Sequence, residues 1–247
     1  MDNYCKTCER STDGWEKIVI LPAQLACRRL DESTKVNLKT VIGRKTRQPI
    51  AFNSPIINPR KQFLEYIPNV TNLTNEDLLK ANAVEVVISQ AAPKGIGSEW
   101  DLLVLVQQLR EKTNGKPIGI KIIAGKIEED LSWVKKSTAD FVTIDDDNKV
   151  GIPAYYALYR ARKFIKENEM ENVDLILSGG LKTASDFIKA IAIGADAIVV
   201  PDKDGEVSDE LATFVRMFGK DDIHEISSAD LATISEEISK FTDIKHA

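Results

Sequence analysis

Short apolar runs of strand length alternate along the chain with longer segments in which apolar residues recur at helical spacing. From residue 83 onward the alternation is regular, so the pattern predicts strands joined by helical crossovers. Parallel strands need such crossovers and are buried on both faces, which predicts an α/β fold with a mainly parallel sheet. The predicted strands are Lys17–Pro22, Pro49–Asn53 as the first strand of a barrel, Ala83–Ser89, Ile118–Ile123, Phe141–Ile144, Val173–Leu177 and Ala197–Val200.

Polar residues with capping chemistry stand before several of the predicted helices. Thr74 with Asp77 has the spacing of a capping box, and Ser98 with Asp101 precedes a long amphipathic segment. Side chains of this type accept hydrogen bonds from the first free N–H groups of a helix. A later helix has its apolar stripe at Ala154, Leu158, Ala161 and Ile165.

The segment from Val173 to Pro201 reads as strand, tight turn, helix and strand. Its turn is Ser178-Gly179-Gly180, and the helix that follows ends at Gly194. A Gly-Gly turn before a helix lets backbone N–H groups approach an anion, and late strand-end loops of (β/α)8 barrels often bind phosphate. The alternative is that the glycines only make a tight turn.

Length and charge narrow the classes of function. At 247 residues, 43% of them hydrophobic, the chain suits one (β/α)8 barrel. The net charge of −5 argues against a nucleic-acid-binding surface. No apolar run is long enough to span a membrane, and the first residues lack the apolar region of a signal peptide, so we expect a cytoplasmic protein.

Three cysteines are too few for a disulfide framework. Cys5 and Cys8 have the spacing of half a zinc site or of a redox pair. Cys27 offers a third ligand, but no nearby histidine offers a fourth. The alternatives are a metal site, completed by a partner chain, and two reduced thiols on a mobile terminus.

Several stretches together resemble the FMN-binding central domain of glutamate synthase, in its archaeal-type stand-alone form. They read GKPIGIKIIAGKIEEDL, GIPAYYALYRARKFI, LILSGGLKTASDFIKAIAIGADAI and RMFGKDDIHEISSADLATI. The resemblance implies a TIM-barrel-like α/β fold, shortened and partly degenerate. It implies a lead-in at residues 1–45, a barrel at 46–218 and a C-terminal helical extension at 219–247.

The family uses FMN and an iron–sulfur cluster to form glutamate from 2-oxoglutarate and ammonia. The resemblance places Lys121 beside the flavin ring, where its charge stabilises reduced flavin and gives it a catalytic role. It places Ser178, Gly179 and Gly180 at the flavin phosphate, with Gly194 and Ala195 matching more loosely. The alternative for Lys121 is a lysine at a strand end paired with Asp145 or Asp146.

Other family features are missing from the chain. The cysteines that follow the family's last strand are absent here, so we expect no iron–sulfur cluster of the family type. The family's substrate loop is replaced by Asp145–Lys149, and Pro201-Asp202 stands where the phosphate site has Gly-Thr. Proline removes an N–H donor, and aspartate brings negative charge toward a phosphate.

Loss of loops with retention of the scaffold predicts a non-catalytic barrel that acts as a partner subunit of a larger oxidoreductase assembly. We therefore expect a protein partner or a homo-oligomer. The alternative is an FMN-dependent oxidoreductase of the glutamate synthase type, supported by Lys121, Gly179 and Gly180.

Overall fold

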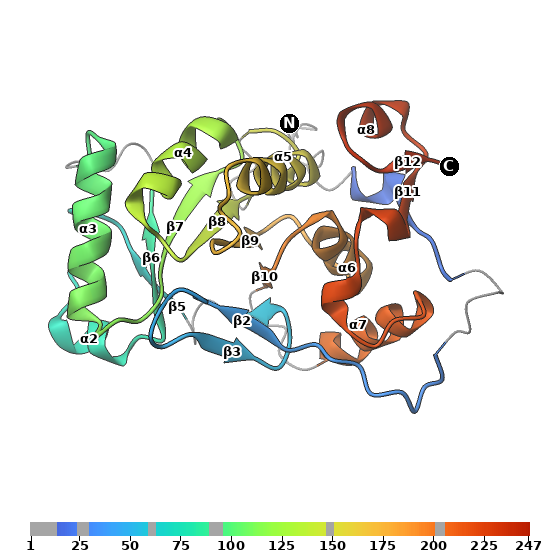
Figure 1. Ribbon diagram of the computed structural model, residues 1–247, viewed down its shortest axis with the longest axis horizontal. Coiled ribbons are helices and arrows are strands. Elements are labelled where there is room, and N and C mark those ends of the chain that lie inside the picture. Colours follow the sequence, from blue (N-terminus) through green and yellow to red (C-terminus); the bar gives the residue numbers. More distant parts are fainter. Residues whose placement is uncertain (1–13, 24–29, 59–62, 89–95, 147–150, 201–205) are drawn as a thin grey trace, which may run out of the picture.

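Seven strands form one parallel, curled sheet at the centre of the molecule, as the computed structural model shows (Figure 1). The structure describes residues 14–23, 30–58, 63–88, 96–146, 151–200 and 206–247. The strands lie in the order β4 (Ile56–Ile57), β10 (Ala197–Val199), β9 (Asp174–Ser178), β8 (Phe141–Asp145), β7 (Ile118–Ile123), β6 (Ala83–Val87) and β5 (Phe63–Tyr66). β4 and β5 form the two edges, so the fold is a shortened α/β barrel, one strand fewer than eight.

Helices cover the outer side of the sheet and follow one another around it (Figure 1). They are α2 (Asn75–Lys80), α3 (Glu99–Lys112), α4 (Ile127–Ser137), α5 (Ala154–Glu167), α6 (Ala184–Ile193) and α7 (Glu206–Met217). Three of them begin at capping residues, whose signals are local in the sequence. Thr74 and Thr183 each form a capping box, and the Ser98 side chain accepts the Asp101 N–H.

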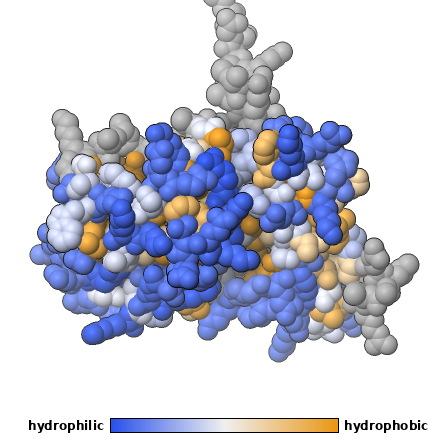
Figure 2. Space-filling model, turned by 45° about the horizontal axis from the view of Figure 1, so that its top comes forward, coloured by the Kyte–Doolittle hydropathy of each residue, from blue (hydrophilic) through white to orange (hydrophobic). Residues whose placement is uncertain are grey.

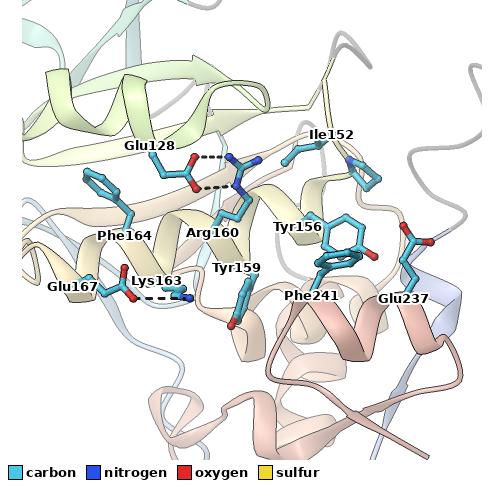
Figure 3. A pocket seen from close by; sticks show the side chains of 11 residues that line it. Glu128, Ile152, Tyr156, Tyr159, Arg160, Lys163, Phe164, Glu167, Glu237 and Phe241 are labelled. Carbon is cyan, nitrogen blue, oxygen red and sulfur yellow. Dashed lines mark hydrogen bonds and ion pairs between the residues drawn. The ribbon is translucent and has the colours of Figure 1, made fainter.

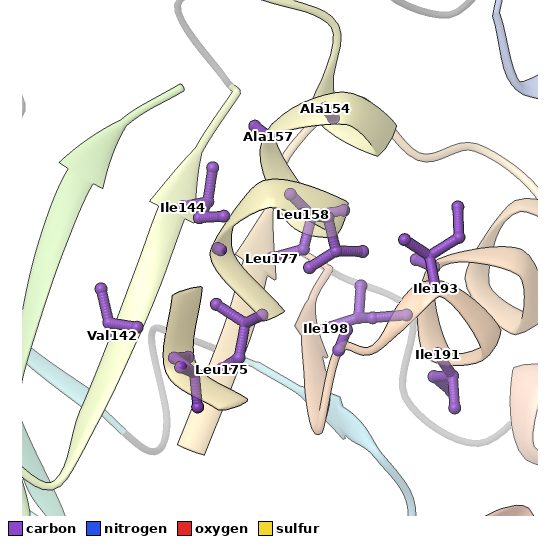
Figure 4. Packing of buried hydrophobic residues seen from close by; sticks show 14 of the residues in the cluster. Val142, Ile144, Ala154, Ala157, Leu158, Leu175, Leu177, Ile191, Ile193 and Ile198 are labelled. Carbon is purple, nitrogen blue, oxygen red and sulfur yellow. The ribbon is translucent and has the colours of Figure 1, made fainter. Parts of the chain in front are cut away.

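Strand residues alternate between two apolar clusters. Figure 4 shows Ile144 and Leu177, from β8 and β9, packed against Leu158 of α5 on the outer side of the sheet. Side chains at the alternate strand positions point inward. There Phe63 of β5 stacks on Phe141 of β8, with ring centroids 4.9 Å apart. A Cβ on Gly119 would stand 2.0 Å from the Phe141 ring, so only glycine leaves room for that ring. Aromatic packing therefore fills one end of the barrel interior.

The prediction that Pro49–Asn53 is the first barrel strand is wrong. Its residues form β3 (Ile50–Phe52), which pairs antiparallel with β2 (Thr40–Ile42) in a separate two-stranded hairpin. The Gly43 N–H donates to Asp174, at the start of β9, over 2.7 Å. This hydrogen bond holds the hairpin at the N-terminal edge of the sheet, and the first barrel strand is the two-residue β4.

Both ends of the described chain meet in a second, three-stranded sheet. β1 (Ile18–Ile20) pairs antiparallel with β11 (Leu231–Thr233), and β11 pairs with β12 (Lys245–His246). The C-terminal extension also contains α8 (Glu236–Phe241) and two 3-10 turns, Ile223–Glu225 and Ser228–Asp230; a third, Trp15–Lys17, precedes β1. The extension was predicted as helical, and its two strands were not foreseen.

The face in Figure 2 is mostly polar, with scattered apolar side chains. Among the described residues, the exposed large apolar side chains are Val19, Leu21, Val70, Leu79, Trp100, Ile234 and Phe241. No helix in the described ranges has the length and apolar character that crossing a membrane requires.

Candidate functional site

A polar layer lies inside the barrel above the aromatic packing, toward the C-terminal ends of the strands. Because side chains alternate along a strand, the inward positions two residues beyond Phe63, Ala83 and Phe141 fall in one layer. Three strands contribute Glu65, Glu85 and Thr143, β7 contributes Lys121, and Asp145 and Ser178 follow one step further along β8 and β9. The C-terminal edge is where TIM barrels carry their chemistry, which makes this layer the candidate site.

Lys121 is the one cation of this layer among the described residues. It is 9% exposed, and its Nζ pairs with Glu65 Oε1 at 3.2 Å. Burial lowers its pKa, but the carboxylates of Glu85, Asp145 and Glu65 outweigh burial and raise the pKa of Lys121. The ammonium is therefore held charged by three surrounding carboxylates.

Glu85 is the most strongly perturbed acid of the layer. It is 3% exposed, and burial raises its pKa to about 7 although Lys121 favours the carboxylate. Thr143 donates its hydroxyl hydrogen to Glu85 Oε1, while Glu65 stands directly opposite on the neighbouring strand. Like charges on facing positions repel, so Glu85 takes up a proton near neutral pH.

The Ser178-Gly179-Gly180 turn lies at the same edge of the sheet, at the end of β9. Gly179 and Gly180 have φ angles of +81° and +72°, which glycine adopts without strain. The Asp146 N–H donates to the Ser178 carbonyl over 2.9 Å. The Asp146 carboxylate, in turn, packs against Gly180. The structure thus brings the predicted turn and Lys121 to one edge, together with several acidic groups.

Gly194 and Ala195 lie elsewhere. They follow α6 and precede β10, at the N-terminal edge of the sheet. The Gly194 carbonyl accepts a hydrogen bond of 2.7 Å from Arg162 Nε, and Arg162 also pairs with Asp196. The structure does not bring these residues together with the Gly179-Gly180 turn, and their contacts are those of a helix end.

Some predicted features fall outside the described residues. Cys5, Cys8 and Cys27 are among them, as are Pro201 and Asp202. Within the described ranges, no group of three or more histidine, cysteine or acidic residues is placed to hold a metal ion. The metal and redox interpretations of Cys5 and Cys8 remain predictions.

Sequence reasoning missed Glu65 and Glu85. For Lys121 it named Asp145 and Asp146 as examples of acidic partners; Asp145 does raise the pKa of Lys121, and the ion pair of Lys121 is with Glu65. A signal was present, since Glu85 is the only charged residue in the five-residue apolar strand AVEVV. A charge in such a strand is rarely buried without a partner, and the pleat directs it into the barrel.

A groove of about 650 Å³ lies on the outside of the barrel, between α4, α5 and α8 (Figure 3). Arg160 forms a two-pronged ion pair with Glu128 in its wall. Tyr156 meets Phe241 edge-on, with ring centroids 6.4 Å apart. None of the predicted site residues lines this groove.

The residues at the barrel edge do not fit the FMN that the resemblance implies. A flavin there needs the charge of Lys121, but that charge is already balanced by Glu65, Glu85 and Asp145. A phosphate at this edge needs free backbone N–H groups at the start of α6, beyond the turn. The N–H groups of Lys182 and Thr183 already donate to the Asp186 carboxylate, at 3.2 and 3.0 Å.

Comparison with known proteins gives a consistent set of relatives. Residues 78–203 match a family model described as a conserved region in glutamate synthase. A glutamate synthase large subunit-like protein of Rhizobium meliloti is 27% identical over 184 residues, which are 55% of this chain and 42% of that protein. An archaeal-type glutamate synthase (NADPH) of Dehalococcoides mccartyi is 36% identical over 127 residues, which are 45% of this chain and 25% of that protein. The chain thus matches less than half the length of either relative.

Solved structures share the fold. A mutant flavocytochrome b2 with benzoylformate superposes with a TM-score of 0.65 at 12% identity, covering 98% of this chain and 81% of the other. A soluble mutant of (S)-mandelate dehydrogenase from Pseudomonas putida gives a TM-score of 0.62 at 12% identity, covering 91% and 90%. At this identity the likeness concerns the fold alone.

Proposed function

Because this chain belongs to the glutamate synthase family, we propose that it is a non-catalytic member whose barrel serves as a partner subunit of a larger oxidoreductase assembly. The shortened barrel keeps capped helices and close-packed strands. The segments that differ from the family pattern are Asp145–Lys149 and Pro201-Asp202. In TIM barrels the segments that follow the strands carry the chemistry. Catalytic function is carried by such sites rather than by the fold itself.

The observation that carries this proposal is the set of three carboxylates around Lys121. With one ammonium among three acids, the layer has a net negative charge even when Glu85 is protonated. Reduced flavin is an anion, and a negative group about 5 Å from a carboxylate costs about 3 kcal/mol at an effective dielectric near 20. The layer therefore opposes the charge that a flavin enzyme must stabilise.

The partner is a protein, either a different chain or a second copy of this one. Val19 on β1, with Leu21 and Ile234 just after β1 and β11, are exposed apolar side chains. Apolar side chains gathered on one exposed element are typical of contact surfaces. They support an assembly.

An absorption spectrum of the natively purified protein, with mass spectrometry of co-purifying chains, tests the proposal. We expect a colourless protein that gains no flavin band when FMN is added at millimolar concentration, together with a stoichiometric partner or a defined oligomer. A yellow protein with one flavin per chain would overturn it. A sharp monomer over a wide concentration range, with no co-purifying chain, would contradict the partner role.

The second candidate is an FMN-dependent oxidoreductase that forms glutamate from 2-oxoglutarate and ammonia. It is favoured by the position of Lys121 and the Gly179-Gly180 turn at one edge of the barrel. A Lys121→Ala variant separates the two candidates. Loss of flavin binding with unchanged folding would support the enzyme, and loss of stability without any flavin effect would support the non-catalytic barrel.

A further inference from the structure

The Asp146 carboxylate lies directly against Gly180. A Cβ built on Gly180 would stand 2.3 Å from Asp146 Oδ2, closer than any side chain permits. Asp146 is 3% exposed, so its carboxylate is enclosed at this turn. Glycine at position 180 leaves room for the aspartate beside it and also adopts the φ angle of +72° without strain.

Backbone pairing fixes Asp146 in this place. The Asp146 N–H donates to the Ser178 carbonyl, which extends the ladder between β8 and β9 by one residue beyond the strand ends. This bond sets Asp146 level with the Gly179-Gly180 turn on the next strand. The position therefore follows from the sheet and does not depend on a long, adaptable side chain.

A second carboxylate occupies the adjoining helix start. Asp186 accepts the N–H groups of Lys182 and Thr183 and completes the capping box of α6. These are donors that an anion bound at a helix N-terminus would use. An incoming phosphate group would meet Asp146 at the turn and Asp186 at the helix, and both repel it.

We propose that Asp146 is a built-in anion that fills the Gly179-Gly180 turn in place of a ligand's phosphate group, and so closes the barrel to phosphate-bearing cofactors. The inference rests on the proposed loss of flavin binding. It names Asp146 as the residue that excludes the phosphate group of FMN. It also explains why a Gly-Gly turn persists in a chain that does not use it for phosphate.

The test compares the wild type with Asp146→Ala and Asp146→Asn. Asp221→Asn is the control, because it removes the same charge at an exposed position outside the layer around Lys121 and leaves the turn filled. The probes are FMN, riboflavin and inorganic phosphate. Riboflavin lacks the phosphate group, so the ratio of the riboflavin Kd to the FMN Kd isolates the effect of the turn.

For wild type and Asp221→Asn we expect no detectable binding of FMN or riboflavin, and no rise in melting temperature in phosphate over chloride at equal ionic strength. For Asp146→Ala we expect a ratio of at least about 10-fold and a melting temperature that rises with phosphate concentration. Asp146→Asn keeps the side-chain volume and should show a smaller change in the same direction. It also serves as the test protein should Asp146→Ala not fold.

Equal phosphate responses in the wild type and in both Asp146 variants, including no response in any of them, would overturn the inference. That result leaves a colourless wild type, and with it the proposed function, unaffected. A yellow wild type that prefers FMN over riboflavin would overturn both.

Discussion

A single substitution, Glu85→Gln, should make the protein more stable at neutral pH. Glu85 is enclosed in the barrel, and burial raises its pKa from 4.5 to about 7. A carboxyl group with a raised pKa binds its proton more tightly in the folded state, so stability falls as pH rises from about 4.5 to about 7. Glutamine carries no charge and can still accept the hydroxyl hydrogen of Thr143.

The size of the effect follows from the pKa shift. A shift of about 2.5 units at 1.36 kcal/mol per unit corresponds to about 3 kcal/mol of stability lost by the wild type across this range. The Glu85→Gln variant does not lose this stability, because glutamine does not ionise. The stability difference, variant minus wild type, should therefore grow by about 3 kcal/mol between pH 4.5 and pH 7 and then level off.

Urea unfolding followed by circular dichroism at pH 4.5, 5.5, 6.5 and 7.5 measures this difference. Asp174 also titrates in the range, because burial raises its pKa to about 6. Both proteins contain Asp174, so its contribution cancels. Growth of less than about 1 kcal/mol, or a variant that becomes relatively less stable as pH rises, would refute the reasoning about Glu85.

Three further substitutions have defined outcomes. Lys121→Met leaves the carboxylates without their cation. It should lower the free energy of unfolding by about 2 kcal/mol at pH 8 and by clearly less at pH 5. A loss of the same size at both pH values in urea unfolding would count against this. Thr183→Ala removes a helix cap and should cost about 1 kcal/mol, or about 2–4 °C in melting temperature; an unchanged melting temperature would contradict this. Gly119→Ala must displace the Phe141 ring and should lower the free energy of unfolding by about 1–3 kcal/mol. A Cβ added at Gly125 meets nothing within 4 Å, so the control Gly125→Ala should unfold at nearly the wild-type urea concentration.

Much of the fold could be predicted because its signals are local. The capping pairs Thr74–Asp77 and Thr183–Asp186 lie three residues apart, and their side chains meet in the structure as the spacing requires. The hairpin strand Ile50–Phe52 was misplaced because its apolar run looks like any buried strand. Only its antiparallel partner and the distant Asp174 show where it belongs.

The candidate site was predicted less completely. Lys121 and the Gly179-Gly180 turn were found, because strand ends and glycine turns are visible in one sequence. The partners of Lys121 could not be ranked, because Glu65 and Glu85 lie 56 and 36 residues before it and the register of the sheet brings them together. Asp146 was considered as a partner of Lys121, and its contact with Gly180 depends on pairing between two strands.

The three-stranded sheet in which β1 meets β11 has a consequence for how the molecule is made. Ile18 pairs with Thr233, so about 210 further residues must leave the ribosome before β1 can find its partner. At roughly 5–20 residues per second, that wait is about 10–40 s. Contacts so distant in sequence are slow to form and rely on the rest of the chain being in place. The barrel strands and helices can assemble meanwhile, so this sheet closes only after the segments between its strands have been made.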